Sequence, residues 1–560
     1  MAIDVENLYD RRADNRWDRT CVGDILERVT WSRPDQVAIT GWAGAFATPE
    51  FERLTYRQAN EVVNRVAHGL LAAGLQRGDR VLLVCENSVE AYLAKFGIAK
   101  AGMVAVPLNP AFAPDVVTQL IALVEPRFSM VDAELWPGVA PAFESAGLRA
   151  DVTIGIGGGP VAGSVAFPEF LAGRPAEEPD TVVHGDDVWE ILFTSGTTAL
   201  PKGVMLSHTY AHMGAYAFAL SLTRGVRIEA DLVQCSFLPV IYHVADQALS
   251  LPAFLAGGRF VIGRRPVPAD MAAAVEREKV TALWGGSPQL VKALAAAMEA
   301  DAGTTTSSLR VLVYGWGAVE PGVLATLEAR CGPEFLLVGI FGQTEAISCH
   351  RFWPAVEREK YEAAGSTVNY VGIPNPLLAS TIMDFDGSDL LGTSGVPGEA
   401  VYRSPAVASG YYRDRAATEE AFRYGWFHSG DSCVADEDGL RIMVDRYKDI
   451  IKSGGENVSS IRVEAMLHEH PQVAKAAVIG LPHDRWGEAV TAVVVRSPGA
   501  TVTEQELVDW ARGRLAGFET PKAVVFADAL PETVGGKVLK YKLRRAMASL
   551  YAEGAAERVG

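Results

Sequence analysis

The sequence predicts an α/β fold, with a large N-terminal domain of mostly parallel sheets flanked by helices and a small C-terminal α+β domain. Length supports this, because 560 residues exceed the roughly 250–300 at which a single hydrophobic core stops growing. Composition agrees, since 49% hydrophobic and 21% charged residues are typical of globular proteins. Helical and strand patterns also alternate along the chain, and the alternation changes near residue 446.

Amphipathic and apolar segments alternate in the larger domain. Residues 56–73 place their apolar side chains on one stripe, as an amphipathic helix does, and the apolar run 80–85 is typical of a buried strand. A helix over 89–101 and a strand over 103–107 continue the pattern. Such βαβ alternation predicts a largely parallel sheet with helices on both faces.

The end of the chain has a different order of elements. We expect one domain at residues 1–446 and a second at residues 447–560. Within the second, the patterns predict a helix, two strands and another helix, at 460–468, 473–479, 489–495 and 503–515. These elements suffice for an α+β domain of about a hundred residues.

Charge and composition exclude several classes of function. The net charge of −17 disfavours a nucleic-acid partner, which needs a basic face. The six cysteines form no CxxC pair and the ten histidines no HExxH pattern, so we expect neither a disulfide framework nor a catalytic zinc site. The N-terminus lacks the apolar core of a signal peptide, and no apolar run approaches the ~20 residues of a membrane span. We therefore expect a soluble, cytoplasmic protein.

A glycine-rich segment at 154–163 invites comparison with dinucleotide-binding loops. Its spacing does not give GxGxxG, because Pro160 occupies the last position. We predict a loop at this place and no cofactor site.

A Ser/Thr/Gly-rich segment is a candidate phosphate site. The strand-like residues 188–193 run into it, and apolar character resumes at 203–207. This segment can bind phosphate oxygens through hydroxyls, backbone N–H groups and one cation. The residues concerned are Thr194, Ser195, Gly196, Thr197, Thr198 and Lys202. It is not a Walker A loop, because Pro201 stands where that pattern has glycine. Alone, such a segment is more often a solvated turn.

The motif at 341–345 offers a carboxylate. It follows the strand-like residues 335–340, and Glu345 at such a strand end can hold Mg²⁺, a cation that prefers oxygen ligands. Thr344 can bond a phosphate or the carboxylate of a substrate, and Phe341 can stack on a purine.

Three more charged residues are candidate ligands. Asp431 follows a predicted tight glycine turn, where it can accept hydrogen bonds from ribose hydroxyls, and Arg446 can add a ribose or phosphate contact. Lys537 lies on a glycine turn and can bring positive charge to a phosphoryl transition state. Singly, each also fits an ordinary turn or a surface ion pair.

Together these motifs resemble the ANL superfamily of adenylate-forming enzymes. In chain order they are TSGTTALPKG, FGQTE, HSGD, DRYKDIIKSGGEN and LPETVGGK. The best match is the acyl-CoA synthetase (acid–CoA ligase) branch, over nearly the whole chain. The resemblance implies that a carboxylic acid reacts with ATP and Mg²⁺ to give an acyl-adenylate and pyrophosphate, and that CoA then receives the acyl group.

The resemblance also implies roles in binding ATP. The loop from Thr194 to Lys202 would bind the phosphates, with Thr344 at the α-phosphate and Glu345 at Mg²⁺. Lys537 would be the catalytic lysine, which bridges the carboxylate and the α-phosphate. Adenine and ribose would be held by Gly317, Ala318, Phe341, Asp431 and Arg446.

The remaining implied roles concern the acyl group and CoA. His243, counted among the catalytic residues, and Trp316 would wall the acyl pocket, for which we expect a moderately large apolar or aromatic acid. Lys448 would be the hinge about which the small domain rotates between the two half-reactions. The CoA side would be lined by Gly454, Gly455 and Trp486.

One departure from the family leaves the acyl acceptor open. Glu519 and Thr520 stand where some members have basic residues that meet the CoA phosphates, and an anion there is unfavourable. A carrier protein or partner enzyme is therefore an alternative acceptor to CoA, and a homodimer is possible. An amino-acid-activating domain is disfavoured because residues 237–240 lack an acidic anchor for an α-amine.

Overall fold

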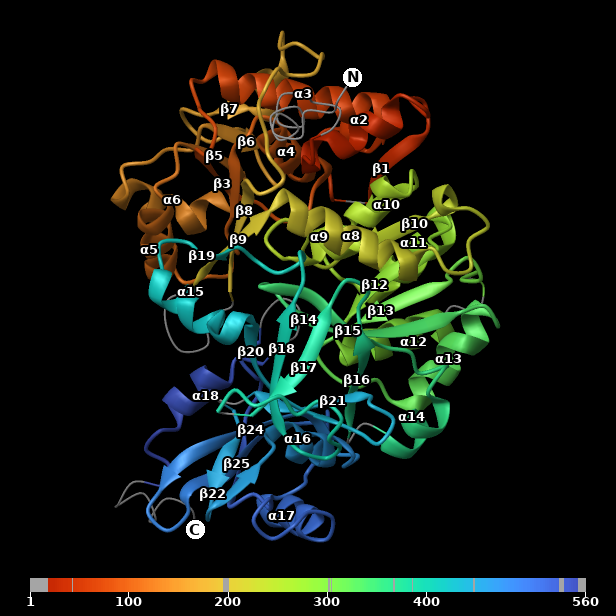
Figure 1. The fold of residues 1–560 in the computed structure, drawn as a ribbon, viewed down its shortest axis with the longest axis vertical. Helices are drawn as coiled ribbons and strands as arrows, with labels where there is room; N and C mark the ends of the chain where they lie inside the picture. The colour runs from red at the N-terminus through yellow and green to blue at the C-terminus, as the bar shows by residue number, and fades with distance from the viewer. Residues whose placement is uncertain are drawn as a thin grey trace, which may run out of the picture.

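The computed structural model describes residues 19–42, 44–194, 201–300, 303, 305–365, 368–384, 386–446, 449–532 and 538–551. Three sheets organise these residues (Figure 1). In Figure 1 the chain passes from the first sheet at one end of the molecule, in red to yellow, to the third sheet at the other end, in blue. No helix within the described ranges is long and apolar enough to cross a bilayer.

The first sheet has a parallel centre and an antiparallel edge. Its strand order is β19 (Gly410–Tyr411), β9 (Gly203–Ser207), β8 (Val188–Phe193), β4 (Val104–Pro107), β3 (Arg80–Val84), β5 (Phe128–Asp132), β6 (Val152–Ile154) and β7 (Val165–Ala166). The pairs from β8 to β7 are parallel, whereas β9 runs antiparallel to both β8 and β19. The β8–β9 connection therefore begins and ends at the same edge of the sheet.

Helices cover both faces of this sheet because its strands are apolar on both sides. Along β3, Val81 and Leu83 pack in the core formed with α3 (Tyr56–Ala72) and α4 (Val89–Lys100). The alternate residues Leu82 and Val84 pack under α5 (Pro114–Val124) and α6 (Trp136–Ser145). A strand buried on both faces is typical of a parallel sheet with crossover helices.

The second sheet is half parallel and half antiparallel. Its order is β17 (Ala379–Met383), β18 (Gly398–Arg403), β20 (Phe427–Ala435), β21 (Arg441–Arg446), β16 (Asn369–Pro374), β15 (Ala346–Phe352), β14 (Leu336–Gln343), β13 (Val311–Tyr314), β12 (Ala282–Gly286), β10 (Val233–Ser236), β11 (Arg259–Ile262), β1 (Val37–Gly41) and β2 (Arg53–Thr55). Pairs from β14 to β1 are parallel and the rest are antiparallel.

Helices of the larger part pack around these two sheets (Figure 1). They are α2 (Ile25–Thr30), α7 (Phe167–Leu171), α8 (His208–Leu222), α9 (Ala245–Leu249), α10 (Leu251–Leu255), α11 (Pro268–Glu278), α12 (Pro288–Ala300), α13 (Pro321–Cys331), α14 (Arg358–Ala364) and α15 (Arg415–Ala421).

The third sheet belongs to the smaller part of the chain. Its order is β23 (Glu456–Val458), β22 (Ile451–Ser453), β25 (Gly487–Arg496) and β24 (Val473–His483), with β26 (Ala523–Phe526) also paired to β25. The accompanying helices are α16 (Ser460–His468), α17 (Glu504–Arg512) and α18 (Lys540–Ala546). The mixed α/β architecture with a small α+β part, as expected from the sequence, is confirmed.

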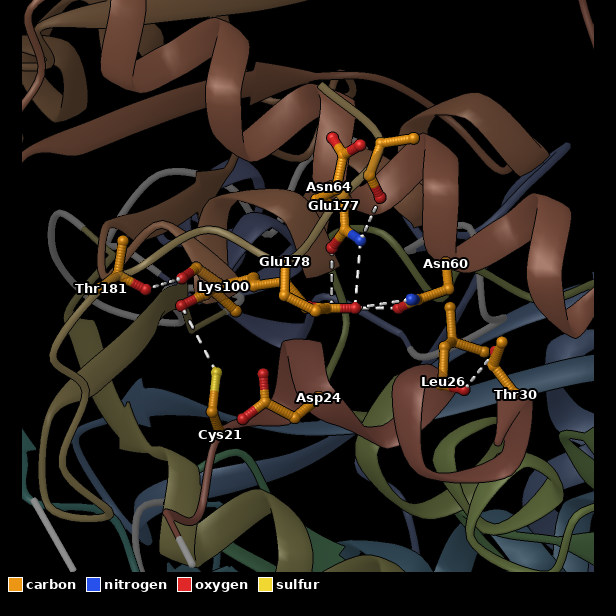
Figure 2. Close-up of polar contacts among 12 residues, drawn as sticks. Cys21, Asp24, Leu26, Thr30, Asn60, Asn64, Lys100, Glu177, Glu178 and Thr181 are labelled. Atoms are coloured by element: carbon orange, nitrogen blue, oxygen red, sulfur yellow. Dashed lines mark hydrogen bonds and ion pairs between the residues drawn. The ribbon is translucent and has the colours of Figure 1, made fainter. Parts of the chain in front are cut away.

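A buried lysine fixes the segment that leads into β8 (Figure 2). Nζ of Lys100, at the end of α4, donates to Oδ1 of Asn60 (3.0 Å) and of Asn64 (2.9 Å) on α3. It also pairs with Oε2 of Glu178 at 2.6 Å, and the backbone carbonyl of Lys100 accepts from the hydroxyl of Thr181 at 2.6 Å. This buried charge holds the segment before β8 against both helices, and its carboxylate and two amide acceptors offset the cost of desolvating it.

Candidate functional site

The β8–β9 hairpin carries the predicted phosphate loop. The backbone N–H of Thr194 donates to the carbonyl of Lys202 (3.0 Å), and the N–H of Lys202 donates to Oγ1 of Thr194 (3.2 Å). These two bonds close the base of the loop. The predicted ligands Ser195, Gly196, Thr197 and Thr198 lie outside the described residues, so their roles stay predictions.

The turn Thr344–Glu345 lies between two paired strands. We expected the preceding strand to end at residue 340, but β14 continues to Gln343 and pairs with β15, so this expectation was wrong. The reason is antiparallel pairing, which extends the strand to a two-residue turn. The hydroxyl of Tyr210 donates to the carbonyl of Thr344 (2.9 Å), and the N–H of Ala408 donates to that of Glu345 (2.7 Å), which fixes the turn.

Tyr411 joins this turn to the phosphate loop. Its hydroxyl donates to Oε1 of Glu345 (2.8 Å), and Nζ of Lys202 lies 4.6 Å from the centre of its ring. Burial, followed by the charge of Glu345, raises the pKa of Tyr411 far above its ordinary value, so the phenol stays a donor. Sequence reasoning missed Tyr411, because it lies on the two-residue strand β19 without any local motif.

Asp431 and Arg446 meet across neighbouring strands. They are register partners on β20 and β21, and Nε of Arg446 lies 3.0 Å from Oδ1 of Asp431, which is almost fully buried. The negative charges of Asp431 and, to a lesser degree, of Glu345 raise the pKa of Arg446. The pair is therefore an ordered, largely desolvated charge pair beside the Thr344–Glu345 turn.

The predicted tight turn before Asp431 was wrong. Residues 427–431 lie inside β20, where the register against β18 shifts and Gly430 has φ +71°. Two extra residues of β20 form a bulge that keeps the chain in the sheet, and glycine tolerates the left-handed backbone.

Five side chains thus converge from separate strands and turns. They are Lys202, Glu345, Tyr411, Asp431 and Arg446. The cluster, which we call the charged site, offers two cations, the exposed Lys202 and the ion-paired Arg446, to an anion, and buried carboxylates to hydroxyls or a metal ion. Among the described residues, no group of three or more His, Cys, Asp or Glu side chains forms a closed metal cage. One carboxylate is nevertheless enough for Mg²⁺, which usually takes one or two protein carboxylates beside phosphate oxygens.

An aromatic wall lies on the predicted acyl side. The ring of Trp316 is 6.1 Å from that of His243 and 5.3 Å from that of Trp284, which sequence reasoning did not single out. Trp316 has φ +66°, unusual for a bulky residue, and is 43% exposed. Nδ1 of His243 accepts from the N–H of Ala245 (3.1 Å), which leaves the proton of the neutral ring on Nε2.

The residues predicted to contact adenine lie in two different parts of the second sheet. Gly317 and Ala318 directly follow Trp316 in the connection after β13. The ring of Phe341 lies 6.2 Å from that of His350 and packs on the core between β16, β18 and β20. Stacking of Phe341 on a purine stays a prediction.

The smaller part brings the predicted CoA residues together. Gly454 and Gly455 form the turn of the β22–β23 hairpin, with φ +63° and +90°. The N–H of Gly454 donates to the carbonyl of Trp486 (2.8 Å), and a Cβ on Gly454 would lie 3.4 Å from the Trp486 ring. Two cations that sequence reasoning missed, Arg485 and Lys522, lie 4.5 and 5.2 Å from the centre of this ring.

Glu519 is neutralised within the fold. Its Oε1 lies 2.9 Å from Nε of Arg462, and its Oε2 accepts from the N–H of Ala516 (3.0 Å). The anion expected to repel CoA phosphates is therefore paired.

The predicted catalytic residue Lys537 and hinge Lys448 lie outside the described residues.

Known proteins resemble this chain in sequence and in fold. The family described as "AMP-binding enzyme" matches residues 26–412, and "AMP-binding enzyme C-terminal domain" matches residues 462–537. A feruloyl-CoA synthase of Amycolatopsis sp is 35% identical over 88% of this chain and 94% of its own. The long-chain-fatty-acid–CoA ligase FadD13 of Mycobacterium tuberculosis is 32% identical over 93% and 98%. The crystal structure of ATP-bound MatB from Rhodopseudomonas palustris superposes with a TM-score of 0.80 at 28% identity, over 94% and 99%.

Proposed function

Because the chain belongs to the family of AMP-binding enzymes, we propose that the charged site is where it adenylates a carboxylic acid. The chain is an ATP-dependent, AMP-forming acid–CoA ligase. The observation that carries the assignment of the site is the meeting of Lys202, Glu345 and Arg446 around the hydroxyl and ring of Tyr411.

The charges of the site suit the first half-reaction. A carboxylate must attack the α-phosphorus of ATP, so two anions have to approach each other. Lys202 at the closed base of the phosphate loop and Arg446 on β21 supply positive charge, which lowers this repulsion. Asp431 can accept hydrogen bonds from ribose hydroxyls while it orients Arg446.

Glu345 is our proposed ligand for Mg²⁺. Among the described residues Tyr411 binds Oε1 of Glu345, which leaves Oε2 for a cation, and the backbone of the Thr344–Glu345 turn is fixed by Tyr210. Mg²⁺ bound there supplies positive charge to the phosphate oxygens. The hydroxyl of Thr344, on the same turn, is our proposed donor to an α-phosphate oxygen.

The second half-reaction is assigned to the smaller domain, residues 447–560. We propose that Lys537 acts in adenylation, and that rotation about Lys448 then brings the hairpin of Gly454 and Gly455 to the site. Arg485 and Lys522 around Trp486 offer the positive charge that a polyanionic acceptor such as CoA needs.

We propose an apolar or aromatic acid as the substrate class. His243, Trp284 and Trp316 form an aromatic wall with a single imidazole donor. Two of the relatives are named for feruloyl and long-chain fatty acyl groups, which are also largely apolar.

The assignment of the charged site is tested with a panel of acids in two assays. Pyrophosphate release and thioester formation with CoA are measured for aromatic, medium-chain and long-chain acids. Acid-dependent release followed by thioester supports the assignment, and Glu345→Gln should abolish release while Glu334→Gln, an exposed control, should not. Release without thioester would move the acceptor to a carrier protein or partner enzyme. Release unaffected by Glu345→Gln would remove the charged site from the mechanism.

A further inference from the structure

Arg351 on β15 is a buried cation without a described counter-ion. The residue is 7% exposed, and Nη1 donates to Oγ of Ser221 and, at 3.5 Å, to the carbonyl of Ala217, both on α8. Among the residues that the structure describes, no carboxylate pairs with it and no other donor of its guanidinium has an acceptor. Burial, followed by the charge of Arg224, lowers its pKa to about 10. Buried charges are normally paired, so this arrangement is costly unless something else completes it.

The residues beside Arg351 lie near the aromatic wall formed by His243, Trp284 and Trp316. Arg351 is the register partner of Ile340 on β14, so the two side chains point to the same face of the sheet. Ile340 and Trp284 both lie close to Gly315. A Cβ added to Gly315 would be 3.6 Å from Cγ1 of Ile340 and 3.4 Å from the ring of Trp284. Trp284 in turn contacts Trp316. Ile340, beside Arg351 on the sheet, and Trp284, beside Trp316, belong to the same hydrophobic cluster, so the acyl wall and Arg351 border one set of packed side chains.

The distance along β15 indicates the length of ligand that fits. Arg351 follows Glu345 by six residues, which is roughly 20 Å along a strand. A group bound to Arg351 therefore lies far from the reacting carboxylate, which has to be at the Thr344–Glu345 turn. Only an extended acid reaches both ends.

We propose that Arg351 determines specificity by binding a second carboxylate at the far end of the acid. The substrate would be an extended dicarboxylic acid whose apolar middle lies along Ile340 and Trp284. Guanidinium and carboxylate form paired, charge-assisted hydrogen bonds, which would satisfy the donors that α8 leaves unused. This inference rests on the proposed adenylation site.

A purely structural role for Arg351 makes a different prediction. A cation near the last turn of α8 interacts favourably with the helix dipole. That role would affect stability and leave the preference among acids unchanged. The variants Arg351→Met and Arg351→Lys, with Arg127→Met at an exposed arginine as the control, separate the two roles.

The test compares diacids from succinate to dodecanedioate with monoacids of the same length, by the acid dependence of pyrophosphate release. We expect the wild type to favour the longer diacids, and Arg351→Met to raise KM for them by about tenfold to a hundredfold, with monoacids unaffected. Arg351→Lys should retain part of the preference. A wild type that prefers monoacids, or phenolic acids, at every length would overturn the proposal, as would an Arg351→Met variant that changes only the unfolding midpoint.

A failure of the proposed function is recognisable separately. If no acid gives pyrophosphate release, adenylation itself fails, and calorimetric binding of dodecanedioate to wild type and Arg351→Met decides the inference. Binding that Arg351→Met weakens would support a carboxylate site at Arg351, and equal or absent binding would overturn it.

Discussion

At the scale of single residues, Tyr411 couples the proposed metal ligand Glu345 to the proposed phosphate ligand Lys202. Its hydroxyl occupies one oxygen of Glu345, and the face of its ring holds the ammonium group of Lys202. One aromatic side chain thereby positions two groups that come from different hairpins. Its pKa, raised by burial, keeps the phenol protonated throughout the working range.

Tyr411→Phe should lower activity without unfolding the site. The substitution removes the hydroxyl and keeps the ring under Lys202. A hydrogen bond to a charged group contributes about 1.5–3 kcal/mol, so kcat/KM for ATP should fall at least about tenfold. Pyrophosphate release at varied ATP and Mg²⁺ measures this, with Tyr216→Phe, on the exposed side of α8, as the control. An unchanged kcat/KM would show that the hydroxyl does not position Glu345.

A buried histidine predicts acid sensitivity of the fold. Nδ1 of His208 accepts from the N–H of Val22 (3.1 Å), and burial lowers the pKa of His208 to about 3. Below pH 6.5 the unfolded chain binds a proton that the folded chain excludes. Stability should therefore fall as the pH drops from 6.5 towards 3, by roughly 1.4 kcal/mol per pH unit. Urea midpoints between pH 7 and 5 should fall more steeply for the wild type than for His208→Asn, and parallel curves would contradict the assignment.

At the scale of elements, a buried ion cluster ties three segments of the active domain together. Nζ of Lys95 on α4 lies 2.5 Å from Oε1 of Glu190 on β8 and 2.5 Å from Oδ2 of Asp246 on α9. It also donates to the carbonyl of Ile241 (3.0 Å), two residues before His243. The strand before the phosphate loop and the segment of the acyl wall are thus held by one cation.

Lys95→Met should damage both halves of the site. Removing one partner leaves buried carboxylates unpaired, a loss of about 3–5 kcal/mol. We expect a lower urea midpoint together with higher KM values for ATP and for the acid. Lys292→Met, which removes an exposed lysine paired with Glu320, should leave all three quantities unchanged. A normal midpoint for Lys95→Met would mean that the cluster contributes no net stability.

Local patterns predicted helices and strands alike, and the strand-like segments 188–193 and 203–207 are β8 and β9. The helix predicted at 56–73 is α3, which starts at a capping box of Thr55 and Gln58, and the helix at 460–468 is α16. Both carry their signals within a few residues. The bulge at Gly430 and the extension of β14 depend on partner strands far along the chain, so no local pattern reveals them.

The same distinction explains the candidate site. Lys202, Glu345, Asp431 and Arg446 were found through motifs, and the structure brings them together. Tyr411, Trp284 and Arg351 have no motif around them. They were singled out by their tertiary contacts, which hydrophobic periodicity and composition do not reveal.

At the scale of the whole molecule, our proposal divides the reaction between the larger and smaller parts of the chain. The charged site and the aromatic wall lie on the first two sheets, and the hairpin of Gly454 lies on the third. The domain boundary after residue 446 and the hinge at Lys448 are proposals that follow from this division. They require that a change in the Gly454 hairpin affects only the second half-reaction.

Gly454→Ala should slow thioester formation and spare adenylation. Alanine is strained at φ +63°, and its Cβ would lie 3.4 Å from the ring of Trp486. Single-turnover assays should show normal pyrophosphate release and a slower acyl transfer to CoA. Gly499→Ala is the matched control, because Gly499 has φ +78° in open space. If acyl transfer were slowed equally in both variants, backbone strain alone would explain the loss, and the hairpin of Gly454 would have no specific role in thioester formation.

Acid-dependent exchange of labelled pyrophosphate into ATP tests the central claim most directly. The wild type should catalyse exchange only when an accepted acid is present. Lys537→Ala should lose exchange while still binding ATP, and Lys542→Ala, at an exposed lysine of α18, should keep it. Exchange that persists in Lys537→Ala, or that proceeds in the wild type without any acid, would contradict adenylation by this site.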